Sequence, residues 1–280
     1  MKILGIALLL TWPLSIPAAV QDVGTVTFLE GSLLIIRGTT VLQAAEGTHL
    51  KQADIIESSE KGFAELEFVG GAIVALGPSS RLYIVRQGAG GKSGSDAAGT
   101  ELVLLNGWLK GQSDTRAGSY RYETPVLAAT TGNGTLVFHN NESGGDVFVE
   151  SGSTSIAEVS PDGRVGKPTA GTAGQFFSRG KGKGLVSSSH PGAAFVDAMP
   201  RSFRDALPSR VAHFSGKPAE PKAQHQVSYV EIQPWLTMPL AWRKGFVDRF
   251  KGRLKDPEFR KQLEIHTAEH PEWGPIQHPE

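Results

Sequence analysis

The chain has 280 residues with 28 basic and 28 acidic side chains, so its formal net charge at neutral pH is zero. This balance gives no sign of a nucleic-acid-binding protein, which needs positive charge to neutralise phosphates. The chain has no cysteine, which excludes disulfides, thiol catalysis and a lipid anchor on cysteine. Glycine is abundant, with 34 residues, and this favours tight turns between short strands over long helices.

Residues 1–19 have the pattern of a secretory signal peptide. Lys2 precedes the apolar run 3–10, and a stretch of small residues ends at Ala18 and Ala19. The run is much shorter than the roughly 20 residues of a membrane-spanning helix, and no later stretch approaches that length. Residues 1–19 are therefore expected to direct export and to be cleaved after Ala18 or Ala19. No integral membrane segment is expected after their removal.

From residue 22 to residue 186, short runs of alternating apolar and polar residues are separated by glycine. Period-2 alternation bounded by Gly, Pro, Asn and Ser predicts half-buried strands joined by turns. Gly70 and Gly71 are expected to form a hairpin turn, because both can adopt positive φ. Glu65 and Glu67 alternate on the preceding strand and are expected to share one solvated face.

The pattern apolar-x-apolar-x-x-Gly occurs three times and ends at Gly31, Gly107 and Gly152. Such copies at unequal spacing indicate a repeated strand-turn-strand unit. The predicted fold class is therefore mainly β: an irregular β-solenoid or sandwich of short antiparallel strands and hairpins, followed by a small α-helical C-terminal region. Trp108, directly after the Gly107 turn, is either an exposed aromatic contact for a partner or a core residue.

Residues 22–180 resemble the FecR-domain family, the periplasmic part of iron-dicitrate-type sensor-regulators and of stand-alone exported proteins. The resemblance lies in GTVTFLEGSLLIIRG, FAELEFVGGAIVALGPSSRLYI, LVLLNGWLKG, YRYETPVLAATTGNGT and AGTAGQFF, in that order. The chain departs from the family at Gly70, where members usually have Asp, and at Asn133, where they usually have Arg. The resemblance implies a periplasmic β-rich domain over 22–186 that senses signals or binds a partner.

After residue 186 the chain becomes polar and rich in glycine and serine. Residues 187–228 are predicted to be a flexible connector with one short helix. Ser202 and Asp205 have capping-box spacing for that helix, and Pro208 would end it.

Residues 229–280 are predicted to be a helical C-terminal region. Four large apolar residues recur at four-residue intervals, namely Trp242, Phe246, Phe250 and Leu254. Leu240 and Val247 lie on the same helical face, at seven-residue intervals that end at Leu254. Asp256 suits the N-cap of a second helix, so a helical hairpin over about 239–269 is expected. Such a pair is too short to be stable alone, and its apolar stripe is expected to pack on the β-rich domain.

The opposite face of this helical region is basic. Arg249, Lys251 and Arg260 are expected to lie in water there, together with neighbouring basic residues. The predicted partners of this face are an acidic envelope protein or an anionic envelope glycan.

Residues 266–270, HTAEH, have the His-x-x-Glu-His spacing of one class of zinc proteases. Pro271 biases His270 out of the α region, so the two imidazoles are not expected to share a helical turn. A catalytic zinc also needs a third protein ligand, which that class takes from a distant downstream helix, and only ten residues follow. His266, Glu269 and His270 are therefore rejected as a metal site and interpreted as packed residues at a helix end. No cofactor and no catalytic residue is assigned.

Two functions from different classes are consistent with these patterns. The first is a non-enzymatic interaction or signal-sensing module of the cell envelope. The second is an envelope-glycan-active or metal-dependent enzyme. A concave cleft lined by two carboxylates would favour the enzyme.

Overall fold

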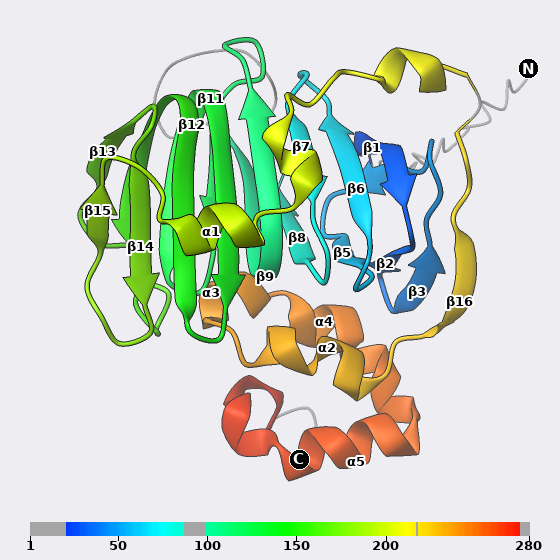
Figure 1. Ribbon diagram of the computed structural model, residues 1–280. Coiled ribbons are helices and arrows are strands. Elements are labelled where there is room, and N and C mark those ends of the chain that lie inside the picture. Colours follow the sequence, from blue (N-terminus) through cyan, green and yellow to red (C-terminus); the bar gives the residue numbers. More distant parts are fainter. Residues whose placement is uncertain (1–20, 87–98, 217, 275–280) are drawn as a thin grey trace, which may run out of the picture.

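The computed structural model of the protein describes residues 21–86, 99–216 and 218–274. The predicted signal peptide, residues 1–19, lies outside the described residues. Within them, sixteen strands belong to one sheet that does not close, and a small helical region follows (Figure 1). The prediction of a mainly β fold with a helical C-terminal region is confirmed.

The sheet is almost entirely antiparallel. The main path of hydrogen-bonded neighbours runs β15-β14-β12-β11-β10-β9-β8-β5-β2-β3-β16, and the other strands branch from it. Only β9 and β10 pair in parallel among the described strands. The strands are β1 (Asp22–Glu30), β2 (Leu33–Arg37), β3 (Thr40–Gln43), β4 (His49–Lys51), β5 (Ile55–Ser58), β6 (Phe63–Phe68), β7 (Ile73–Leu76), β8 (Arg81–Arg86), β9 (Thr100–Ser113), β10 (Tyr120–Glu123), β11 (Leu127–Asn141), β12 (Gly144–Glu158), β13 (Thr169–Thr172), β14 (Phe176–Gly180), β15 (Val186–Ser188) and β16 (Lys222–Gln226).

The three glycines of the repeated sequence pattern lie where strands end or change partners. Gly31, Gly107 and Gly152 have φ of +74°, +96° and +76°, a region open mainly to glycine. In β9, the residues before Gly107 pair with β8 and β10, whereas Gly107 and the residues after it pair with β7 and β11. One long strand therefore serves two parts of the sheet, and an apolar core forms between them.

Side-chain alternation gives the sheet a second apolar face. Along β8, Leu82 and Ile84 belong to the central core, whereas Tyr83 belongs to a cluster covered by the C-terminal helices. Along β7, Val74 faces the central core, whereas Ile73 joins a third cluster around Trp108. Each outer cluster needs a cover, and two different segments supply it.

The strap, defined as residues 189–216, covers the cluster around Trp108. It contains α1 (Ala193–Ala198), η1 (Arg201–Arg204) and η2 (Val211–Phe214), and it crosses the sheet in front of β11, β9 and β7 (Figure 1). Three apolar side chains of the strap are buried, namely Phe195, Phe203 and Leu207. The sequence predicts a flexible connector over 187–228; in the structure the strap, which is part of this segment, is packed on the sheet through these three side chains and through backbone hydrogen bonds to Glu67. The capping box predicted at Ser202 and Asp205 is also absent from the described helix, which is a single 3-10 turn without a side-chain cap.

The helical region covers the other outer cluster. It consists of α2 (Tyr229–Leu236), α3 (Leu240–Arg243), α4 (Phe246–Phe250), η3 (Lys251–Lys255), α5 (Pro257–Ile265), η4 (Thr267–Glu269) and η5 (Pro271–Trp273). Trp242, Phe246 and Phe250 are buried against the strands, so the predicted packing of this stripe on the β-rich domain is confirmed.

The path of the helical region differs from the predicted hairpin. Several short helices replace two long ones, Leu254 is only partly buried, and Leu240 is 55% exposed. The Asp256 N-cap is confirmed, because its carboxylate accepts hydrogen bonds from the backbone N–H groups of Glu258 and Phe259. Within the described residues, no helix is long and apolar enough to cross a membrane.

Candidate functional site

Two carboxylates of β6 anchor the strap to the sheet. Glu67 accepts hydrogen bonds from the Ser209 hydroxyl at 2.5 Å and from the backbone N–H groups of Arg210 and Val211 at 3.0 Å each. Glu65 forms an ion pair with the Arg210 guanidinium. Glu65 and Glu67 share one face as predicted, but the prediction that water covers this face is wrong. Both residues are 4% exposed, because the strap lies over them.

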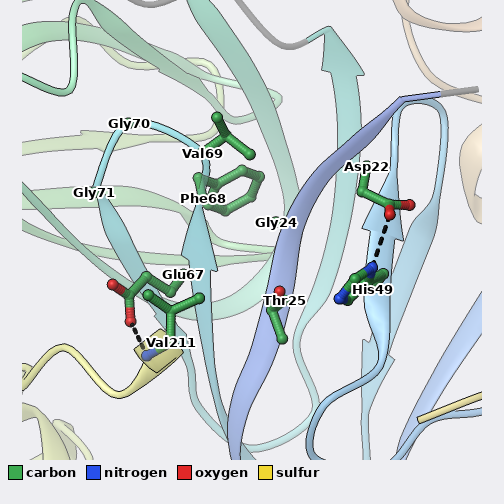
Figure 2. Close-up of a pocket in the computed structure, with 10 residues that line it drawn as sticks. All are labelled: Asp22, Gly24, Thr25, His49, Glu67, Phe68, Val69, Gly70, Gly71 and Val211. Carbon is green, nitrogen blue, oxygen red and sulfur yellow. Dashed lines mark hydrogen bonds and ion pairs between the residues drawn. The ribbon is translucent and has the colours of Figure 1, made fainter. Parts of the chain in front are cut away.

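A groove of about 300 Å³ lies beside this anchor, at the start of β1. Figure 2 shows its walls: β4 on one side, and the β6–β7 turn with the strap on the other. The predicted hairpin glycines, Gly70 and Gly71, form part of its rim with φ of +104° and +93°. The lining residues are Asp22, Gly24, Thr25, His49, Glu67, Phe68, Val69, Gly70, Gly71 and Val211.

A row of three polar side chains crosses the floor of the groove. Thr25 of β1 pairs in register with His49 of β4 on one side and with Glu67 of β6 on the other. Residues that are directly opposite in antiparallel strands place their side chains on the same face. The backbone register therefore places an imidazole, a hydroxyl and a carboxylate side by side.

An imidazole–carboxylate pair forms the outer wall of the groove. Nδ1 of His49 lies 2.7 Å from Oδ2 of Asp22, and both side chains are partly exposed. Because a carboxylate accepts hydrogen bonds, Nδ1 carries a proton in this pair, and Nε2 is the ring nitrogen that remains for other contacts. In Figure 2 this second ring nitrogen lies on the side of His49 that faces Thr25.

The two carboxylates of the groove do not form an acid–base pair. Both oxygens of Glu67 already accept hydrogen bonds from the strap, and Asp22 is bonded to His49. A general acid needs a proton that it can release to a substrate, and a general base needs a free oxygen within reach of one. Glu67 satisfies neither condition, so the arrangement fits binding better than hydrolysis.

Trp108 is a core residue in the structure. It is 8% exposed, and its indole stacks on His139 with ring centroids 4.2 Å apart. Phe195 of the strap packs on it, with ring centroids 5.1 Å apart. Of the two interpretations that the sequence left open, burial in the core describes Trp108.

Arg249 does not lie on a free basic face. Its guanidinium donates hydrogen bonds to the backbone carbonyls of Ile36, Gly38 and Ala53, at 2.7, 2.8 and 2.6 Å. Burial lowers its pKa from the ordinary arginine value. The prediction of a solvated Arg249 is therefore wrong, because Arg249 of α4 donates to backbone carbonyls of β2, of the turn after it and of the turn before β5.

Lys251 and Arg260 remain exposed, with 57% and 53% of their side chains accessible. Each has an acidic neighbour on the same helical segment: Asp248 at 3.0 Å from Lys251 and Glu264 at 4.0 Å from Arg260. Neither residue lies in the groove, so the predicted partner contacts and the groove are separate surfaces.

Both histidines of the HTAEH motif pack on Tyr229. His266 stacks on its ring with centroids 5.5 Å apart, and Nε2 of His270 lies 3.0 Å from its hydroxyl. His270 has φ of −146° and ψ of 67°, outside the α region as predicted from Pro271. Among the described residues, no group of three or more histidine, aspartate or glutamate side chains is placed to hold a metal ion.

Acidification is expected to destabilise the protein through His270. Burial is the largest cause that lowers its pKa, and Arg243 acts in the same direction. The folded state thus binds fewer protons than the unfolded state. The stabilising contribution of neutral His270 is complete above the unfolded pKa of about 6.5 and is lost as the pH falls through the lower folded pKa. Thermal melts between about pH 8 and pH 5 should show this loss.

The control for this prediction is an exposed histidine. His270→Asn should flatten the dependence of the melting temperature on pH, whereas His213→Asn, at an exposed position, should leave its slope unchanged. An identical slope in His270→Asn and the parent protein would contradict the assignment.

No family model and no curated protein matches the chain. Two crystal structures of candidate anti-sigma factors from Parabacteroides distasonis are similar to part of it. The first has a TM-score of 0.39 and 7% identity over 51% of this chain and 64% of that one. The second has a TM-score of 0.37 and 6% identity over 49% of this chain and 59% of that one. This chain thus spans less than two thirds of the length of either structure.

Proposed function

We propose that this protein is an exported, periplasmic interaction or signal-sensing module of the FecR-domain type, and not an enzyme. In this proposal, the groove beside β1 binds a segment of an envelope protein. The resemblance of residues 22–180 to the FecR domain supports the class and the compartment.

One observation carries the assignment of the groove. Arg249, which the sequence predicts as a partner contact outside the groove, is bonded within the protein to backbone carbonyls near β2 and β5. The groove combines the partly exposed Asp22–His49 pair with an exposed apolar rim, in which Val69 is 58% and Val211 is 40% exposed. Exposed aliphatic groups around polar groups are typical of a binding surface.

Filling the groove is expected to abolish partner capture without unfolding the protein. Val211→Trp adds a large ring at the rim, where the Val211 side chain is exposed and only its backbone N–H bonds to Glu67. The measurement is capture of proteins from the organism's envelope extract by the immobilised variant, analysed by mass spectrometry. The melting temperature is expected to stay within about 2 °C of the parent, as for other surface substitutions.

Val186→Trp is the matched control, because Val186 is 64% exposed on β15, at the opposite end of the sheet from β1 (Figure 1). It should retain the captured partner. Charge reversal of both Lys251 and Arg260 tests the basic surface in the same assay. Loss of capture in that double variant, with Val211→Trp unaffected, would move the binding site to the helical region and favour an anionic partner.

A further inference from the structure

The strap lies on the sheet as an added segment and not as a further strand (Figure 1). Its backbone-to-backbone hydrogen bonds with described residues stay within the strap, as in those from Phe203 to Pro200 and from His213 to Arg210. Most of its side chains face water. The sheet therefore holds the strap through side chains, in the way that a receptor holds a bound peptide. The sheet surface beneath it is called the strap face, and its contact residues are Phe63, Glu65, Glu67, Trp108, Lys110 and Gln112.

Side chains of the strap face bind main-chain groups of the strap. The Gln112 amide uses both of its ends on one residue: Nε2 donates to the Leu207 carbonyl at 3.0 Å, and Oε1 accepts from the Leu207 N–H at 3.1 Å. The Lys110 ammonium donates to the carbonyls of Phe203 and Asp205 at 2.7 and 2.8 Å. Main-chain hydrogen bonds supply affinity in peptide recognition, and pockets for side chains supply specificity.

Buried charge distinguishes the strap face from an ordinary apolar contact. Lys110 is completely buried, and Glu65 and Glu67 are each 4% exposed. Taking charged groups out of water is costly, and apolar side chains of similar shape are often at least as stabilising. Charged groups in such a place fix one register of the segment that they contact. A fixed register is what selective recognition of a peptide requires.

An aromatic pocket receives one strap side chain. The Phe203 ring meets the rings of Phe63 and Trp108 edge-on, with centroids 6.1 and 6.5 Å away. Gly77 leaves space beside this pocket, because a Cβ there would lie only 3.1 Å from Cγ of Pro200. The pocket thus fits an aromatic side chain that enters from a close-lying backbone.

Two more strap side chains have positions of their own. Leu207 is buried in the same apolar cluster as Phe203. The Arg210 guanidinium forms an ion pair with Glu65 and lies over the Phe28 ring, 4.9 Å from its centroid. Lysine would keep the charge but would lose the planar stacking. The strap face therefore recognises the pattern Phe-x-x-x-Leu-x-x-Arg, which the strap presents at residues 203–210.

We propose that the strap face is a second partner site, which binds a segment of a protein partner with the pattern Phe-x-x-x-Leu-x-x-Arg, and that the strap is its built-in competitor. The inference goes beyond the proposed function of the groove. The strap is tethered at both ends, so its effective concentration at the face is on the order of millimolar. A partner held in the groove gains the same advantage, since Glu67 and Val211 belong to the groove and to the strap attachment.

A strap-weakened variant tests whether the face accepts a peptide. Phe203→Ala, Leu207→Ala and Arg210→Ala are combined in one full-length chain, which leaves the strap face itself unchanged. The probe is a fluorescein-labelled peptide of residues 199–212, followed by fluorescence anisotropy. It is expected to bind the variant at least about tenfold more tightly than the parent protein, because the tethered competitor is weakened. A peptide with the same three alanine substitutions should bind the variant at least about tenfold more weakly.

A sheet-side substitution shows where the peptide binds. Gln112→Leu, added to the strap-weakened variant, removes the amide that contacts the peptide main chain and should weaken binding about threefold to tenfold. Gln224→Leu is the matched control, because Gln224 is an exposed residue of β16, outside the strap face. It should leave the affinity unchanged.

Hydrogen exchange of the parent protein in low urea tests whether the strap opens, and it needs no variant to fold. The amides of residues 203–211 are expected to exchange through a local opening whose rate changes little with urea. Amides of β9 and β11 should exchange through global unfolding, which urea accelerates strongly.

Four outcomes would overturn the inference. They are equal urea dependence of the strap and β9 amides, no peptide binding by the folded strap-weakened variant, equal binding of the alanine peptide, and no effect of Gln112→Leu. A dimer of the parent protein that the strap peptide dissociates would make a second copy of the chain the occupant, and would overturn the partner assignment. None of these results alters the test of the groove, which is capture of the envelope partner by Val211→Trp.

Discussion

Phe250→Asp is expected to lower the melting temperature by roughly 10 °C, since an unpaired carboxylate in an apolar cluster costs about 4 kcal/mol. Phe250 is fully buried, and its ring meets Phe246 edge-on with centroids 5.5 Å apart. The nearby Arg249 guanidinium, 4.8 Å from the ring centroid, could not neutralise the new charge freely, because it already donates to three carbonyls. Differential scanning calorimetry measures the change.

Leu240→Asp is the control for this substitution. It introduces the same charge in the same helical region, at a residue that is 55% exposed, and it should change the melting temperature by no more than about 2 °C. If Phe250→Asp melted like the parent protein but lost its envelope partner, the apolar stripe would be a binding surface and not a packing face.

The packing of this stripe could be predicted from sequence, whereas the position of Arg249 could not. Four-residue spacing of large apolar residues is a local signal, and it identified Trp242, Phe246 and Phe250 as buried. On a helical wheel Arg249 lies outside this stripe. Its surroundings depend on the carbonyls of Ile36 and Gly38, more than 200 positions earlier in the chain.

The position of the strap also depends on contacts with residues that are distant in the chain. A segment with few apolar residues resembles a flexible connector, and composition gives no sign of a partner for its backbone. The strap is nevertheless fixed, because Glu67 accepts two of its backbone N–H groups and Lys110 donates to two of its carbonyls. Alternation correctly placed Glu65 and Glu67 on one face, but it could not show what covers that face.

The groove was only partly predictable from sequence, because one part of it is a local turn and the other depends on how three strands pair. The Gly70–Gly71 turn that forms its rim has a local sequence signal, and its positive φ values agree with the prediction. The row of His49, Thr25 and Glu67 depends on the register of three strands that are far apart in sequence. No spacing rule connects these positions, so a threonine in a strand pattern gave no hint of a binding site.

Lys110→Met is expected to release the strap from the sheet. The Lys110 side chain is completely buried, and its ammonium contacts the carbonyls of Phe203 and Asp205 at 2.7 and 2.8 Å and the Glu150 carboxylate at 2.8 Å. All three donors of the ammonium are used. Methionine has a similar length but no donor, so both carbonyls and Glu150 lose their partner. Removing one member of a buried ion pair costs about 3 to 5 kcal/mol of folding stability. We expect about 3 kcal/mol for Lys110→Met, because Glu150 is 35% exposed and water can reach its carboxylate.

Limited trypsin digestion measures this release, because the strap has arginines at 201, 204 and 210. Trypsin should cut Lys110→Met first within 201–210, whereas the parent protein should resist cleavage there, since its anchored backbone cannot enter the protease. Lys61→Met, at an exposed lysine, controls for the loss of a positive charge and should be cut like the parent. An unchanged digestion pattern and melting temperature in Lys110→Met would mean that Phe195, Phe203 and Leu207 hold the strap by apolar contact alone, and that the buried ammonium contributes nothing to its attachment.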